Sequence, residues 1–132
     1  MVINNLSLSK TTRLFLVIAS LFGATGVALG AYSSHGLASW ANINQIEYFQ
    51  LAVTYQLFHA LALLAVSILS IFITNRILTA SKISFILGIF CFSGSLYLYV
   101  YTGTKILGAI TPIGGLFLIV AWLLLAIAVI RK

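Results

Sequence analysis

The sequence has almost no acidic residues, since Glu47 is the only aspartate or glutamate among its 132 residues. Nucleophilic catalysis of the Ser-His-acid kind needs a carboxylate next to a histidine, and no such set, nor a Cys-His pair, can be assembled here. The sequence also lacks a glycine-rich phosphate loop between a strand and a helix. We therefore predict that the protein is not an enzyme.

Cysteine and histidine are equally scarce. Cys91 is the only cysteine, so no intrachain disulfide can form, and its apolar surroundings predict a buried structural thiol. The two histidines, His35 and His59, are expected at different depths, the first in or near a loop and the second inside a helix. Ligation of a haem by two histidines needs both at one depth. We predict no metal and no cofactor.

Apolar residues, by contrast, are abundant. They make up 62% of the chain, charged residues make up 6%, and the mean hydropathy is +1.18, which lies far outside the range of soluble domains. A helix needs roughly 20 apolar residues to cross a bilayer. We predict an all-α fold, an integral membrane bundle of four transmembrane helices in a single domain over residues 1–132. The expected spans are residues 14–31, 51–73, 83–101 and 112–130.

The connections between these spans are predicted from polar intervals and helix-start signals. Residues 32–50 form the longest polar interval and are expected to be a loop that ends in an interfacial turn. Thr111 and Pro112 resemble a helix start, because threonine caps helices and proline suits the first helical position. The first span has a basic start and a small-residue end, so a cleavable signal peptide stays as an alternative to a span.

The basic residues predict the orientation in the membrane. The net charge is +6, but the basic residues are scattered at the ends of apolar runs, which is atypical of a nucleic-acid interface, so the expected partner is the lipid bilayer. Under the four-span prediction Lys105 lies alone on one side. The other side carries Lys10, Arg13, Arg76, Lys82, Arg131 and Lys132. Because basic residues accumulate in the cytoplasm, both termini are expected to be cytoplasmic.

A polar cluster opens the second span. Tyr55, Gln56 and His59 are three and four residues apart, so they share one face of a helix. With the predicted topology, several other polar residues fall at a similar depth in the outer half of the bundle. The candidate cluster is His59, Gln56, Tyr55, His35, Ser93 and Tyr97.

This candidate cluster has two interpretations. In the first, its side chains hydrogen-bond across helices and fix how the helices pack. In the second, it is a small-molecule or proton site with His59 as the titrating group, because histidine changes charge near neutral pH.

Small residues recur at helical spacing in two spans. Gly26 and Gly30 form one pair four residues apart, and Ala19 and Gly23 form another. The third span carries a stripe of small residues: Ser84, Gly88, Cys91 and Ser95. Such stripes let a neighbouring helix approach closely, so another membrane protein or a second copy of the chain is an expected partner.

Four motifs, in order and in spacing, resemble the YgdD-like family of small bacterial inner-membrane proteins, whose function is uncharacterised. They cover essentially the whole chain after the first dozen residues. The motifs are residues 29–37 with Gly30 and His35, residues 55–63 from Tyr55 to Leu63, residues 92–97, and residues 108–115. The resemblance implies a four-helix, multi-pass protein of the bacterial cytoplasmic (inner) membrane, and it supplies no activity or substrate.

These observations lead to two functional hypotheses. The first is a non-enzymatic accessory or structural membrane component, because neither a soluble domain nor a reactive set of residues is found. The alternative is a small transporter or channel subunit with a polar site around His59. Small drug-exporting transporters depend on a carboxylate in their first span, and residues 14–31 contain none.

Overall fold

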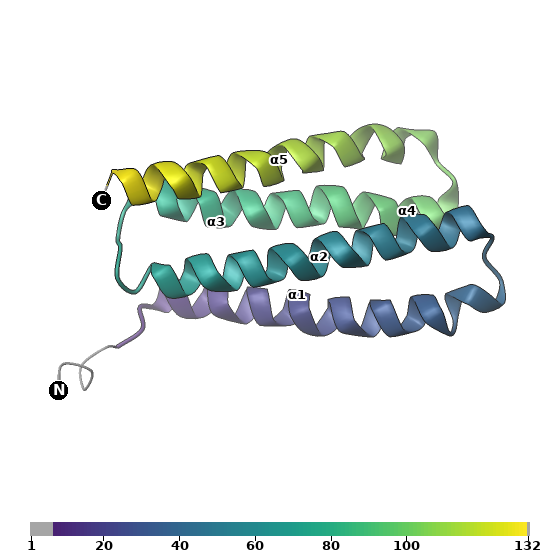
Figure 1. The fold of residues 1–132 in the computed structure, drawn as a ribbon, viewed down its shortest axis with the longest axis horizontal. Helices are drawn as coiled ribbons and strands as arrows, with labels where there is room; N and C mark the ends of the chain where they lie inside the picture. Colours follow the sequence, from purple (N-terminus) through teal and green to yellow (C-terminus); the bar gives the residue numbers. More distant parts are fainter. Residues whose placement is uncertain (1–6, 132) are drawn as a thin grey trace.

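The computed structural model describes residues 7–131, and all the regular structure in this range is helical (Figure 1). Four helical segments are long and apolar enough to cross a membrane, which confirms the predicted fold class. The elements are α1 (Lys10–Ser34), a short 3₁₀ helix η2 (Leu37–Ser39), α2 (Ile43–Leu69), α3 (Arg76–Ile89), a π-helical turn η3 (Phe90–Gly94), α4 (Ser95–Thr102) and α5 (Lys105–Ile130). The third spanning segment is the continuous run α3–η3–α4.

Three of the helices begin at a short polar side chain that caps them. The Ser9 hydroxyl accepts a hydrogen bond from the backbone N–H of Thr12 at the start of α1. Asn75 does the same for α3, accepting from the N–H of Leu78. Asn42 and Gln45 form a reciprocal capping box at the start of α2. Each cap satisfies backbone donors that the first helical turn leaves free.

The first connection is shorter than the loop predicted over residues 32–50. Helix α1 continues to Ser34 and α2 already begins at Ile43, so only the short segment with η2 lies between them. The prediction was wrong because it took polar composition as a sign of loop. The capping box at Asn42 starts the helix early, and Asn44 and Glu47 lie on its exposed surface.

The helix start predicted at Thr111 and Pro112 was also wrong. Helix α4 ends at Thr102 and is capped by Gly103, which has a left-handed φ of 62°, and α5 begins at Lys105 with Pro112 inside it. Proline lacks an N–H, so the Gly108 carbonyl loses its helical partner. Gly108 and Pro112 are both exposed in the first turns of α5, where other donors can reach that carbonyl.

The four spans form a bundle with two central and two outer members. In Figure 1 the second and third spans lie in the middle, with α1 packed on α2 and α5 packed on α3 and α4. About half of the most apolar stretch of α2 is buried, against 17% for α1 and 22% for α5. Phe15 and Ala19 of α1 belong to the main hydrophobic core, which favours a retained span over a signal peptide.

The small residues identified in the sequence mediate packing inside the bundle. A Cβ on Gly26 would lie 2.6 Å from Leu57 of α2, and one on Gly30 would lie 3.3 Å from Val53. A Cβ on Gly88 would collide with Leu118 of α5. The expected close helix approach is therefore present, and the neighbouring helices belong to the same chain.

The π-helical turn η3 is a feature that the sequence pattern did not reveal. Its backbone packs directly on α5, because a Cβ on Gly114 would collide with the backbone of Cys91 and Phe92. Cys91 is half-buried at the edge of this contact, so the prediction of a buried thiol was wrong. The backbone of the turn, and not the Cys91 side chain, occupies the space against α5.

Two serines of α3 add hydrogen bonds to the same interface. The Ser81 hydroxyl donates to the Ala121 carbonyl at 2.8 Å, and the Ser84 hydroxyl donates to the Phe117 carbonyl at 2.7 Å. Both serines are buried. The two hydrogen bonds, about one turn apart, hold α3 and α5 in register.

Candidate functional site

Gln56 is the centre of the polar cluster. Its side chain is 5% exposed, and its amide nitrogen donates to the Phe22 carbonyl at 2.9 Å and to the Thr25 hydroxyl at 2.8 Å. Its amide oxygen accepts a hydrogen bond from the Tyr97 hydroxyl at 2.8 Å. One side chain on α2 therefore ties α1 to α4, which is what the helix-packing interpretation predicts.

Ser93 and Tyr97 complete the contact between α2 and the third span. The Ser93 hydroxyl, in the π-helical turn, donates to the Ala52 carbonyl at 2.7 Å and is buried. The Tyr97 ring packs on Phe49 with centroids 4.8 Å apart. Ala52 and Gln56 are one turn apart on α2, so these groups form a single interface with Gln56.

His59 lies beside this interface among aromatic rings. Its Nδ1 is 2.8 Å from the Tyr55 carbonyl, and because a carbonyl only accepts hydrogen bonds, Nδ1 carries the proton. Nε2 makes no hydrogen bond to any residue in the described range 7–131. The rings of Tyr55, Phe85 and Trp122 have centroids 5.6 to 6.3 Å from the imidazole.

A lateral cavity of about 450 Å³ opens next to His59 between α2, the third span and α5. It is lined mainly by apolar and aromatic groups, including Tyr55, Phe58, Phe92 and Trp122. Tyr55 stacks on Phe92 at 4.2 Å and keeps 37% of its surface exposed. The cavity suits an apolar group that offers one hydrogen-bond donor to Nε2.

The sixth candidate, His35, is not part of the cluster. It follows α1 as its C-terminal cap, with an exposed side chain, and its backbone N–H contacts the Ala31 and Tyr32 carbonyls. The structure places it apart from His59, at the different depth that the sequence predicted, because α1 runs on to Ser34 and carries His35 to the end of the bundle.

An aromatic rim, formed by Tyr32, Trp40 and Tyr101, closes the end of the bundle near His35. The Tyr101 hydroxyl donates to the Tyr32 oxygen at 3.0 Å, and the Trp40 Nε1 donates to the same oxygen at 3.4 Å. These contacts join the connection after α1 to the end of α4, and they suit amphipathic rings at a membrane surface.

Sequence reasoning missed two residues of the site. Thr25 binds Gln56 and Trp122 lines the cavity of His59. Trp122 carried a usable signal, because it lies eight residues, or about 12 Å, inside the end of its span, away from the usual interfacial position of tryptophan.

In the range 7–131 no three histidine, cysteine or acidic side chains gather as metal ligands.

Comparison with known proteins identifies the family. Residues 29–115 match the family described as "Protein of unknown function (DUF423)". A UPF0382 membrane protein of Staphylococcus aureus (SAB0533) is 38% identical over 119 residues, covering 90% of this chain and 97% of the relative. A UPF0382 membrane protein of Haemophilus influenzae is 37% identical, covering 85% of this chain and 90% of the relative.

A third relative, the UPF0382 membrane protein YwdK of Bacillus subtilis, is 33% identical and covers 90% of this chain and 98% of its own length. No solved structure matches the chain. The matched residues include the whole of α2 and of the third span, which carry Gln56, His59, Ser93 and Tyr97. The chain therefore belongs to the DUF423 (UPF0382) family of membrane proteins, a family of unknown function.

Proposed function

We propose that this chain is a non-enzymatic accessory or structural component of the bacterial cytoplasmic (inner) membrane and a YgdD-like member of its family. The observation that carries the proposal is the hydrogen bonding of Gln56, whose amide makes three hydrogen bonds that join three helices. Ser81, Ser84 and Ser93 likewise bind carbonyls of neighbouring helices. These groups hold the bundle together and leave little free for chemistry.

The distribution of charge supports an orientation with both termini in the cytoplasm. Lys10, Arg13, Arg76, Lys82 and Arg131 all lie toward the end of the bundle where the described chain starts and stops. Lys105 lies at the opposite end, and Lys132 lies outside the described residues. Five basic residues against one follow the positive-inside pattern.

The partner of such a component is another membrane protein or a second copy of the chain. The face of α1 turned away from α2 exposes Ser20, Ala24 and Ala28, which are four residues apart. Gly23 also has open space where a Cβ would be. Small side chains at this spacing allow a further helix to approach α1.

Purification from native membranes in a mild detergent tests this proposal, with mass spectrometry of the proteins that are retained. We expect a partner in near-equal amount, or a dimer, that is lost in Ala24→Phe. Leu14→Phe is the matched control, because Leu14 is exposed on the same helix, lies ten residues from Ala24 and already carries a large side chain. A monomer that retains no protein partner would contradict the accessory role.

A small transporter or channel subunit is the second candidate, favoured by the cavity beside His59 and the free Nε2. In proteoliposomes, His59→Gln should abolish a pH-dependent flux of protons or small solutes while the folded protein stays in the membrane. His35→Gln, which alters an exposed histidine, is the control. A flux that persists unchanged in His59→Gln would remove this candidate.

A further inference from the structure

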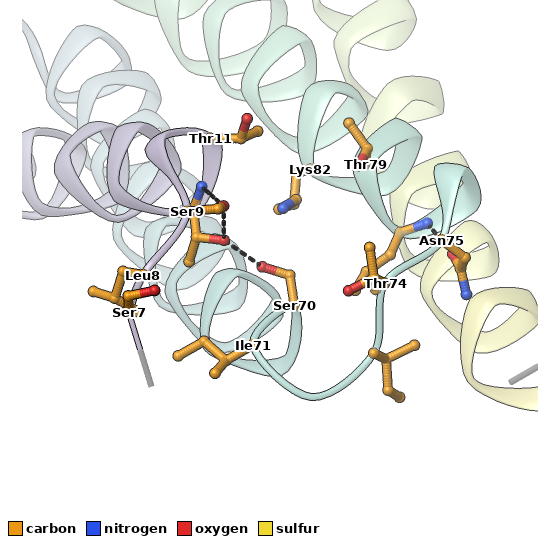
Figure 2. A pocket seen from close by; sticks show the side chains of 13 residues that line it. Ser7, Leu8, Ser9, Thr11, Ser70, Ile71, Thr74, Asn75, Thr79 and Lys82 are labelled. Atoms are coloured by element: carbon orange, nitrogen blue, oxygen red, sulfur yellow. Dashed lines mark hydrogen bonds between the residues drawn. The ribbon is translucent and has the colours of Figure 1, made fainter. Parts of the chain in front are cut away.

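A second cavity lies at the other end of the bundle, where the start of α1 meets the loop between α2 and α3. Its volume is about 400 Å³. Figure 2 shows the side chains around it, which come from the start of α1, from the loop and from α3. Most of the residues that line it are polar and uncharged. The polar groups include Ser9, Thr12, Ser70, Thr74, Asn75 and Thr79. The hydroxyls of Ser9, Thr12 and Ser70 already bond to one another or to Ser67. Those of Thr11, Thr74 and Thr79 form no hydrogen bond within residues 7–131, so they can donate to a bound molecule.

Lys82 is the only charged residue in the lining of this cavity. The residue is 2% exposed, and Figure 2 shows its nitrogen directed into the cavity from α3. Nζ lies 4.4 Å from the centroid of the Phe15 ring. Within residues 7–131, Nζ forms neither a hydrogen bond nor an ion pair, so a buried ammonium faces the cavity without an acceptor.

The sequence cannot supply a carboxylate partner for Lys82 from an aspartate or glutamate. Glu47 is the only acidic side chain, and it lies in the second turn of α2, whereas Ser70 at the cavity follows the end of that helix. The sequence separation of 23 residues corresponds to about 35 Å of helix. A buried charge without a partner is costly, so an anion that enters the cavity would stabilise Lys82.

The helix ends around the cavity carry partial charges of both signs. Helices α1 and α3 both begin here, and the start of a helix carries a partial positive charge. Helix α2 ends here, but its last carbonyls are already occupied. Backbone N–H groups of the following turn donate to Val66 and Leu69, and the Ser70 hydroxyl donates to Ser67. Helix α5 also ends at this end of the bundle, and Ser9 and Asn75 cap the starts of α1 and α3, so the charge of Lys82 is the main attraction for an anion.

We propose that this cavity binds an oxyanion of the phosphate class, with the Lys82 ammonium as its charged contact and the surrounding hydroxyls as hydrogen-bond donors. This assignment goes beyond the proposed accessory role. The cavity lies at the end of the bundle where a bilayer surface would be, so the phosphate belongs either to a free anion or to a lipid headgroup. Both sources present the same oxygens to Lys82.

The test uses the full-length protein in nanodiscs of a galactolipid, whose headgroup contains no phosphate. In one arm inorganic phosphate is titrated and binding is followed by calorimetry. In the other arm the nanodiscs contain phosphatidic acid, and bound lipid is detected by native mass spectrometry. Lys82→Met keeps the apolar stem and removes the charge. Lys10→Met is the matched control, because Lys10 is an exposed lysine at the same end and does not line the cavity.

We expect Lys82→Met to weaken binding at least about tenfold, as the loss of a charge-assisted hydrogen bond predicts, while Lys10→Met changes it little. Binding in the first arm alone identifies a free anion, and binding in the second alone identifies a headgroup. Thr79→Val, which removes one lining hydroxyl with little change in shape, should weaken binding a few-fold and serves as a second variant if Lys82→Met does not fold. The absence of binding in both arms, or equal binding by wild type and Lys82→Met, would overturn the assignment.

Discussion

At the scale of single residues, Gln56 illustrates how one buried amide organises the interface of three helices. Each of its three hydrogen bonds reaches a different group, on Phe22, Thr25 and Tyr97. A leucine would fill most of the same volume but would leave the Thr25 and Tyr97 hydroxyls without this partner. The free energy of unfolding depends on such groups because hydrocarbon offers no replacement.

We therefore expect Gln56→Leu to lower the free energy of unfolding by about 2 kcal/mol, given that hydrogen bonds between membrane helices contribute about 0.6–1 kcal/mol each. Unfolding in mixed micelles of mild and denaturing detergent measures this change. Thr54→Val is the control, because the Thr54 hydroxyl is exposed and bonds only to the Gln50 carbonyl of its own helix. Equal stability of Gln56→Leu and wild type would show that the amide does not hold the helices.

Lys82 leads to the opposite expectation for stability. Without a bound anion its buried ammonium has no acceptor in the described part of the chain, so Lys82→Met should raise the free energy of unfolding by about 1 kcal/mol or more. The measurement is made in zwitterionic detergent without phosphate. Lys10→Met, at an exposed position, should change stability by less than about 0.5 kcal/mol. A loss of stability in Lys82→Met would mean that the contact with Phe15 outweighs the cost of burying the charge.

The sequence predicted part of this residue-scale detail. It placed Gln56, Ser93 and Tyr97 at one depth, and the structure joins them through α2. It treated Lys82 only as a topology signal, although Leu78, Lys82, Phe85 and Ile89 repeat at helical spacing and are all buried. Helical spacing gives the face of a residue, but only the packed bundle shows which face is buried and what a side chain meets there.

At the scale of helices, the number and type of elements followed from the apolar runs, whereas their ends and irregularities did not. Long apolar runs allow only helices in a bilayer, which is why the four spans were predictable. Pro112 is tolerated inside α5, and η3 interrupts the third span, because contacts between helices compensate local preferences. Those contacts involve residues far apart in the sequence.

The contact between η3 and α5 provides a sharp test at this scale. Gly114→Ala places a Cβ against the backbone of Phe92, so it should separate the two segments and lower the free energy of unfolding by about 1–3 kcal/mol. Gly115→Ala is a matched control, since its Cβ would lie 3.9 Å from the Phe92 ring, an ordinary contact. It should be neutral or slightly stabilising, because alanine favours helix. Detergent unfolding measures both variants. Equal free energies of unfolding for Gly114→Ala and Gly115→Ala would contradict the close packing at Gly114.

At the scale of the whole molecule, the orientation of the bundle is a direct prediction. A reporter enzyme that is active only outside the cytoplasm should be silent when fused after Lys132 and active when inserted near Lys105. The physical reason is the concentration of basic residues at the end opposite Lys105. Insertion after Ser39, between α1 and α2, is an internal control that should report like Lys105. The opposite pattern of reporter activity would show that the predicted orientation is wrong. A pattern that fits three spans would favour the signal-peptide alternative.

The pairing of α1 with α2, and of α5 with α3 and α4, has a consequence for biogenesis. Each half of the chain is a helical hairpin that packs mainly on itself, and the segment of residues 70–75 is the only covalent link between the halves. A translocon could release the first hairpin into the lipid before the second is synthesised. Two separately translated fragments, divided at Thr74, should then find each other in the membrane and reconstitute the bundle. Docking would form the central seam of Gln56, Ser93 and Tyr97 and the hydrophobic core that α2 shares with α3.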